Sequence, residues 1–220
     1  MVESSTFENA WLKDFSALCR GFLFTSPWRS LATQGCYTTI NTPVGDAALL
    51  QGDFQQQLRQ HFAAAKKQGI ANPLLVGAIP FDVSQPASLF IPESWQSFNR
   101  ADLQQALPAQ QSDLPAVRRR TAVPDHAVFT RMVADAVATI QRGDPDKVVL
   151  SRLMDIVTEQ PVDTAALMQR VIAQNPNSYH FHLPLAEGGA LVGASLGTNA
   201  AQTGARFLLL PAGRLGAPPS

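Results

Sequence analysis

Four stretches of the chain carry apolar residues at the three-to-four spacing of an amphipathic helix. They are residues 7–18, 53–68, 125–141 and 163–174. The second is the clearest, because Phe54, Leu58 and Phe62 form one stripe, Asp53 is placed to be the N-cap and Gly69 to end the helix. We therefore expect four helices, each burying one face.

Between these stretches lie short runs rich in β-branched and aromatic residues, which predict strands. They are residues 21–25, 35–40, 73–80, 88–91, 147–157, 178–185 and 190–195. A Glu-Gly-Gly turn at Glu187–Gly189 can join the last two as a β-hairpin. Adjacent hairpin strands favour an α+β fold over a doubly wound parallel sheet. Asn99–Pro124 has no periodicity and is interpreted as a surface excursion or linker.

Charge is sparse and balanced. Only 15% of the 220 residues are charged, with 17 basic and 17 acidic side chains. Because the largest basic run is Arg118–Arg120, nothing indicates a nucleic-acid partner. Every acidic residue lies at or before Glu187, and the segment from Leu196 to Ser220 is mostly Gly, Ala, Leu and Pro. Ordinary domains do not usually end in this way.

Cys19 and Cys36 lack the spacing of a zinc site, and we expect both to be reduced thiols in the core. The N-terminal residues do not match a signal peptide, and no run approaches the roughly 20 apolar residues of a membrane helix. We therefore expect a cytoplasmic protein without a membrane partner.

Few residues stand out as chemically active, since the common dinucleotide, phosphate, zinc-protease and serine-hydrolase motifs are missing. His180 and His182 share one face of a predicted strand about 7 Å apart, which could form a metal-binding edge; without a third ligand nearby, the sequence favours a structural or surface role. Lys147 precedes the apolar run Val-Val-Leu. Such surroundings can leave a neutral amine that acts as a general base, but the spacing alone favours a lysine at the start of a strand with a solvated head group.

Several longer motifs resemble a known family. They are Gly-Ala-Ile-Pro-Phe-Asp at 77–82, the segment 88–98, Lys-Val-Val-Leu-Ser-Arg at 147–152, and the pair of segments 175–185 and 189–195. Together they closely resemble isochorismate synthase, a chorismate-utilising enzyme, and match best the form that supplies 2,3-dihydroxybenzoate to enterobactin-type siderophores. The resemblance runs from Gly21 to Ser195.

The resemblance implies an α+β enzyme that binds Mg²⁺ and isomerises chorismate, with water entering at one ring carbon while a hydroxyl leaves from another. Lys147 matches the family's general base, and its presence favours the water-adding branch of the family. The family's general acid is a glutamate two residues after the Gly-Ala-Ser that ends the last strand, where this chain has Gly197. Glycine has no proton to donate, so one half of the acid–base pair is missing.

The departure from the family begins at Leu196, which suggests a reading-frame error. With permitted codons, Gly197–Thr203 reread one nucleotide later gives Glu-Leu-Thr-Leu-Arg-Lys, and Ala212–Pro219 gives Leu-Ala-Gly-Ser-Ala-Arg-Arg; both are like the family's continuation. We therefore interpret residues 1–195 as the N-terminal portion of one chorismate-binding domain and 196–220 as an aberrant tail.

By the same resemblance, the family's magnesium ligands and most of its contacts to the substrate lie beyond this chain. We expect the 220-residue polypeptide to be inactive, to bind Mg²⁺ poorly and not to fold cooperatively. The alternatives are salicylate synthase, the menaquinone-pathway isochorismate synthase and, in another class, a noncatalytic fragment or binding module.

Overall fold

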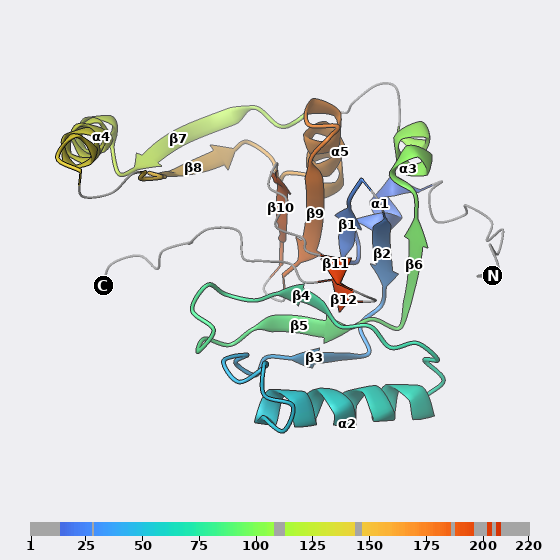
Figure 1. Cartoon of the computed structure of the whole chain (residues 1–220). Coiled ribbons are helices and arrows are strands. Elements are labelled where there is room, and N and C mark those ends of the chain that lie inside the picture. The colour runs from blue at the N-terminus through green and yellow to red at the C-terminus, as the bar shows by residue number, and fades with distance from the viewer. Residues whose placement is uncertain are drawn as a thin grey trace. The chain divides into compact units, whose positions relative to one another are not determined.

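A computed structural model describes residues 14–27, 29–107, 113–143, 147–185 and 188–195, together with the backbone of 202–203 and 206–207. The chain divides into two compact units (Figure 1). Unit 1 contains residues 1–111 and 164–220, and unit 2 contains residues 112–163.

The larger sheet of unit 1 is antiparallel, with strand order β10-β9-β1-β2-β6. Its strands are β1 (Leu23–Thr25), β2 (Ser30–Gln34), β6 (Ser94–Phe98), β9 (Tyr179–Pro184) and β10 (Ala190–Ser195). Three helices pack against one face: α1 (Phe15–Leu18), α3 (Arg100–Ala106) and α5 (Thr164–Gln174). Leu18, Leu103 and Met168, one from each helix, are almost fully buried there.

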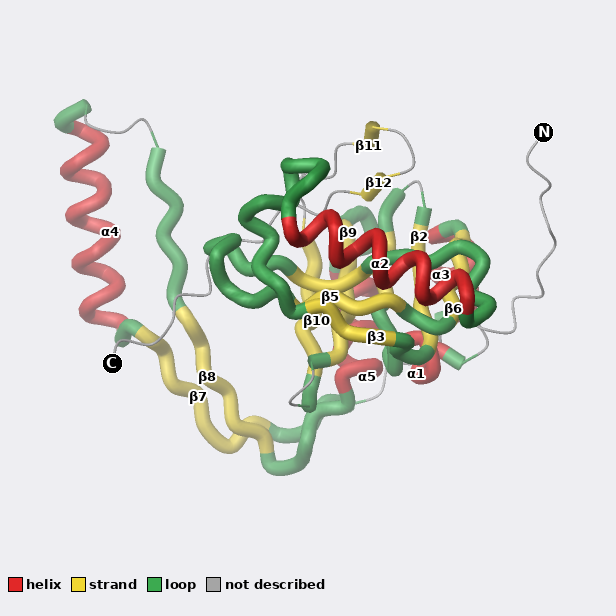
Figure 2. The backbone as a smooth tube through the Cα atoms, turned by 90° about the horizontal axis from the view of Figure 1, so that it is seen from below, coloured by secondary structure: helices red, strands yellow, loops and turns green. Residues whose placement is uncertain are grey.

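A second antiparallel sheet covers the other face of the first. It has the order β3-β5-β4 and contains β3 (Thr38–Ile40), β4 (Val76–Ala78) and β5 (Ser88–Ile91). Phe22 and Phe24 from the first sheet share a buried cluster with Val76 of β4. Helix α2 (Asp53–Lys67) packs on the second sheet through Phe54 and Ala65 (Figures 1 and 2). Unit 1 is therefore layered as helices, sheet, sheet and helix.

Unit 2 is a two-stranded antiparallel ribbon and one helix. The ribbon pairs β7 (Val117–Val123) with β8 (Leu153–Thr158), and the helix is α4 (His126–Gln141). In both views α4 stands beyond the end of the ribbon and does not lie across it (Figures 1 and 2). In addition, β11 (Gln202–Thr203) and β12 (Arg206–Phe207) pair antiparallel in the C-terminal segment.

The α+β fold and its most regular elements confirm the sequence predictions. Helix α4 begins after Asp125, whose side chain accepts a hydrogen bond from the Val128 amide at 2.9 Å. The last two predicted strands form the expected hairpin, and Gly188 and Gly189 both have positive φ. Gly69, with φ 93°, ends α2 as predicted. Of the predicted helix 7–18, residues 7–13 lie outside the described residues.

Several local predictions were wrong. The N-cap of α2 is Gly52, and Asp53 is its first helical residue. The segment predicted as an excursion, 99–124, contains α3 and β7. Strands β2 and β6 were missed, because their polar and aromatic residues do not alternate cleanly, and β3 and β4 are shorter than predicted.

The strand predicted from Lys147 begins only at Leu153. Leu153 pairs with Val123, the last residue of β7, after which the chain turns into α4. Residues 147–152 therefore have no partner strand within the described part of the chain, and a strand cannot form without one.

Candidate active site

Lys147 is exposed in the irregular segment that leads to β8 of unit 2. Its neighbour Val149 is 80% exposed, so the apolar strand that was expected to desolvate the lysine is itself in solvent. Within the described residues Lys147 has no apolar enclosure, and its role as a general base stays a prediction.

Arg152, the last residue of the motif 147–152, contacts helix α4. The guanidinium of Arg152 lies 5.3 Å from the centre of the Phe129 ring on α4, a cation–π distance. Arg152 thus connects the segment before β8 to the helix. Lys147 lies five residues before Arg152 and takes no part in this contact.

The predicted general-acid position, Gly197, lies outside the described residues. The last described residue before it is Ser195, which ends β10 opposite Tyr179. The sequence alone is enough to exclude Gly197 as a general acid, because glycine has no side chain that could donate a proton.

His180 and His182 share one face of β9, as predicted, and both are buried. The Nε2 atom of His180 donates to the backbone carbonyl of Asn175 at 2.8 Å, which leaves Nδ1 to accept from the Thr25 hydroxyl at 2.7 Å. The Nε2 atom of His182 lies 3.0 Å from the Thr164 hydroxyl at the start of α5. These contacts join β9 to both ends of α5 and to β1, which supports the structural interpretation of the pair.

Burial lowers the pKa of both imidazoles, because a charged ring would lose its hydration there. For His180 the Asn175 carbonyl opposes this shift, and the positive charge of Arg100 adds to it. For His182 the opposing groups are the backbone carbonyls of Gly21 and of His182 itself. The neutral form is therefore favoured at both positions.

Arg100 was missed by the sequence analysis. It donates from Nη1 to the Pro176 carbonyl at 3.0 Å and from Nη2 to the Ser178 carbonyl, which holds the turn before β9 against α3. Burial lowers the pKa of its guanidinium. The available signal was the capping box of Asn99 and Asp102, which marks the start of a helix inside the supposed linker.

The Gly-Ala-Ile-Pro-Phe-Asp motif has a structural basis in this chain. Gly77 has φ 141°, and a Cβ added there would lie 2.0 Å from the Ser88 carbonyl oxygen of β5. Asp82 accepts from the Ser84 hydroxyl at 2.6 Å and the Ser84 amide at 3.0 Å. These bonds lower the pKa of Asp82, so its carboxylate stabilises the turn.

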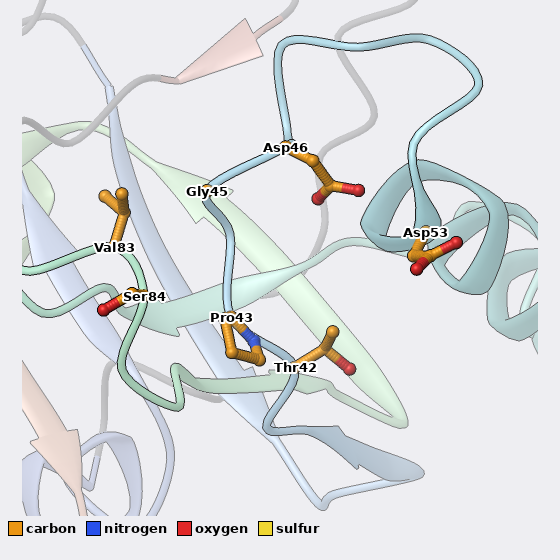
Figure 3. Close-up of a pocket in the computed structure, with 7 residues that line it drawn as sticks. All are labelled: Thr42, Pro43, Gly45, Asp46, Asp53, Val83 and Ser84. Atoms are coloured by element: carbon orange, nitrogen blue, oxygen red, sulfur yellow. The ribbon is translucent and has the colours of Figure 1, made fainter.

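One shallow depression of about 270 Å³ lies between the loop before α2 and the loop before β5 (Figure 3). Its lining includes two carboxylates, Asp46 and Asp53. The Asp46 carboxylate accepts from the Phe54 amide at 3.4 Å and so belongs to the start of α2. A depression lined by two carboxylates repels anionic ligands, and none of its lining residues was predicted as a site residue.

Metal and thiol chemistry find little support in the described residues. Among them, no group of three or more His, Cys, Asp and Glu side chains could hold a metal ion. Neither cysteine forms a disulfide; Cys19 is buried, but Cys36 is exposed, so the prediction of two core thiols was wrong for Cys36. Desolvation and then the charge of Glu93 raise the pKa of the Cys36 thiol. No helix in the described part of the chain has the length and apolar character to cross a membrane.

Comparison with known proteins identifies relatives of this chain. Residues 89–196 match the family model described as chorismate binding enzyme. The isochorismate synthase EntC of Escherichia coli K12 is 48% identical over 191 residues, which are 86% of this chain and 49% of the relative. The chain therefore spans about half the length of the curated relative.

Solved structures agree with the fold. A protein described as a 2,3-dihydroxybenzoate-specific isochorismate synthase, DhbC, from Bacillus anthracis matches with a TM-score of 0.62 and 27% identity, over 84% of this chain and 46% of that one. MenF, the menaquinone-specific isochorismate synthase of E. coli, matches with a TM-score of 0.57 and 24% identity, over 82% and 46% of the two chains. The second likeness concerns the fold alone.

Proposed function

We propose, from the premise that this chain belongs to the chorismate-binding enzyme family, that it is part of an isochorismate synthase. The observation that carries the proposal is the 48% identity to EntC over 86% of the chain. We assign it to siderophore biosynthesis in the cytoplasm, as for the enterobactin-type enzymes that it resembles, with chorismate as its substrate.

The proposed reaction converts chorismate to its isomer isochorismate, with one water molecule consumed and one released. Water adds to one ring carbon of chorismate, the double bonds shift, and the hydroxyl on another carbon leaves as water. The Nζ atom of Lys147, when neutral, takes a proton from the attacking water, and an acid protonates the leaving hydroxyl. Lys147 is placed for exchange with solvent, because it is exposed.

The same proposal makes the present chain inactive alone. Gly197 stands at the acid position, and about half of the relative's length is absent. The family's Mg²⁺ would neutralise the substrate's carboxylates. The described residues do not fit such an ion, since none of their acidic or histidine clusters has three members, and we derive no step through it.

We further propose that residues 196–220 are translated from a shifted reading frame. The family match ends at residue 196, which supports this boundary. Sequencing the gene across codons 190–220 tests the proposal. If the adjacent frames do not encode the two motifs that the family has after this point, the proposal is wrong.

The test of function restores the missing part. A chimera joins residues 1–195 of this chain to the half of EntC that the chain does not match, and chorismate turnover is followed by product analysis. We expect isochorismate without release of pyruvate. Lys147→Ala should lower kcat by about 10²- to 10⁴-fold, the usual contribution of a general base, whereas Lys67→Ala, at an exposed lysine of α2, should leave kcat unchanged.

Other products separate the alternatives. Salicylate and pyruvate would identify a salicylate synthase. A chimera that binds chorismate without converting it would favour a noncatalytic module. Full turnover by the Lys147→Ala chimera would remove Lys147 from the mechanism while leaving the family assignment intact.

A further inference from the structure

The segment from Lys147 to Arg152 carries the proposed general base but is not held by strand pairing. The hydrogen-bonded pairing of β7 with β8 begins only at Leu153, and Lys147 itself is exposed. A general base works only when its nitrogen is kept within hydrogen-bond reach of the water that it deprotonates. Some other contact therefore has to fix this segment, and the described residues contain one.

That contact is the stacking of Arg152 on Phe129. The guanidinium carbon of Arg152 lies 5.3 Å from the centre of the ring, and a cation is attracted to an aromatic face within roughly 6 Å. A guanidinium group is planar and weakly hydrated, so it stacks on such a ring better than an ammonium group does. Because Phe129 lies near the start of α4 and Arg152 directly precedes β8, the contact joins the helix to the segment before the strand.

The burial of side chains in unit 2 follows the same contact. Most side chains of α4 are exposed, but Phe129 and Ala136 are partly buried. These two are seven residues apart, close to two full turns, so they lie on one face of the helix. In residues 147–152 only Leu150 and Arg152 are partly buried. This distribution is expected where one side of the segment lies against the Phe129–Ala136 face of α4.

Chain length confines Lys147 once Arg152 is fixed. Helix α4 ends at Gln141, about 18 Å along the helix axis from Phe129. The chain has to return that distance to bring Arg152 onto the ring, and Figure 2 shows it running back from the end of α4 to β8. Lys147 is five residues before Arg152, a reach of at most about 17 Å. With the stack in place both ends of the returning segment are tied to α4, whereas without it only one end is.

We propose that Phe129 is a positioning residue for the general base: through Arg152 it fixes the segment that carries Lys147. Phe129 acts on the placement of the lysine and makes no contact with the reacting atoms. This inference rests on the proposed function and deepens it, because the contact matters to catalysis only if Lys147 deprotonates the attacking water. The effect of the contact on the order of the segment is measurable without catalysis.

The first measurement is NMR spectroscopy of the full 220-residue chain labelled with ¹⁵N. The aromatic ring shields protons above its face, so in Phe129→Leu the Nε–H proton of Arg152 should move downfield, and the ¹H–¹⁵N NOEs of residues 148–151 should fall. Leucine forms helices at least as well as phenylalanine, so the change leaves α4 intact. Phe129→Tyr keeps the aromatic face and should keep both signals. Met132→Leu, at an exposed residue of the same helix, is the matched control and should change neither.

The second measurement is the turnover of chorismate by the chimera with EntC described above. Phe129→Leu should lower kcat at least about threefold, the rate equivalent of an exposed cation–π contact, with KM unchanged. Phe129→Tyr should restore kcat, and Met132→Leu should not alter it. The double variant Lys147→Ala/Phe129→Leu should be no slower than Lys147→Ala, because without the base there is nothing left to position.

The results separate this inference from the proposed function. Unchanged NOEs in Phe129→Leu overturn the inference. So does a loss of kcat that Phe129→Tyr shares or that multiplies with the loss in Lys147→Ala, since either pattern indicates a merely structural role. An active chimera whose kcat is unaffected by Phe129→Leu contradicts the inference and leaves the proposed function intact. A chimera without turnover contradicts the proposed function, and the NMR measurement then upholds or overturns the placement of the segment by Phe129.

Discussion

His180 and His182 are buried in unit 1, where each imidazole is hydrogen-bonded within the protein. Because burial lowers the pKa of both rings, the unfolded chain binds their protons more readily than the folded chain does. The stability that they contribute is fully present above the unfolded value near pH 6.5. It is lost as the pH falls from there toward the lowered pKa of the folded state.

We therefore predict that the free energy of unfolding of unit 1 decreases as the pH is lowered below about 6.5. The slope is at most about 1.4 kcal/mol per pH unit for each histidine. Urea unfolding at a series of pH values measures it. The double variant His180→Gln/His182→Gln should be less stable at pH 8 but should show a shallower dependence on pH. Equal slopes for the two proteins would exclude the pair as the origin of the effect.

At the scale of elements, Gly77 shows how a motif can be explained by packing. A side chain at position 77 would be disfavoured by the positive φ, and it would also clash with the Ser88 carbonyl oxygen of the neighbouring strand. Gly69, at the end of α2, shares the positive φ but has no atom within 4 Å of the added Cβ. The two glycines therefore separate the effect of backbone conformation from that of steric contact.

We predict that Gly77→Ala destabilises unit 1 by more than about 3 kcal/mol, because β4 has to move away from β5. Gly69→Ala should cost only about 1 kcal/mol, the strain of a non-glycine residue at positive φ. Urea denaturation followed by far-UV circular dichroism compares the two variants. Similar losses would mean that β4 adjusts freely and that the close approach at Gly77 is unimportant.

The elements that could be predicted are those whose local signals agree with their packing. Helix α4 has both the apolar spacing and the Asp125 cap, and its boundaries follow. Strands β2 and β6 could not be predicted, because they contain several polar residues and lack a clear apolar alternation. What holds them as strands is their pairing with each other, with β6 at the edge of the sheet and β2 next to it. For the site, the face shared by His180 and His182 follows from strand alternation, but their partners Thr25 and Thr164 are distant in sequence. The strand predicted to begin at Lys147 was wrong for a related reason. Its partner strand, β7, ends at Val123, which pairs with Leu153, so β8 cannot extend back to Lys147.

At the scale of the whole molecule, the two units differ in how much apolar surface they bury on folding. Unit 1 has three clusters of buried hydrophobic residues, whereas no described residue of unit 2 is buried. Burial of apolar surface is the main favourable term in folding, so only unit 1 has a substantial driving force of its own. The chain alone should therefore not unfold as one cooperative system.

We predict that hydrogen exchange of the isolated chain will be strongly protected in β1 and β9 and nearly unprotected in α4 and β7, because local opening of unit 2 exposes almost no additional apolar surface. Mass spectrometry of peptides from the two units measures the difference, and limited proteolysis should cut first between residues 113 and 163. Equal protection of the two units would contradict the prediction, since it would mean that α4 and the ribbon are already covered.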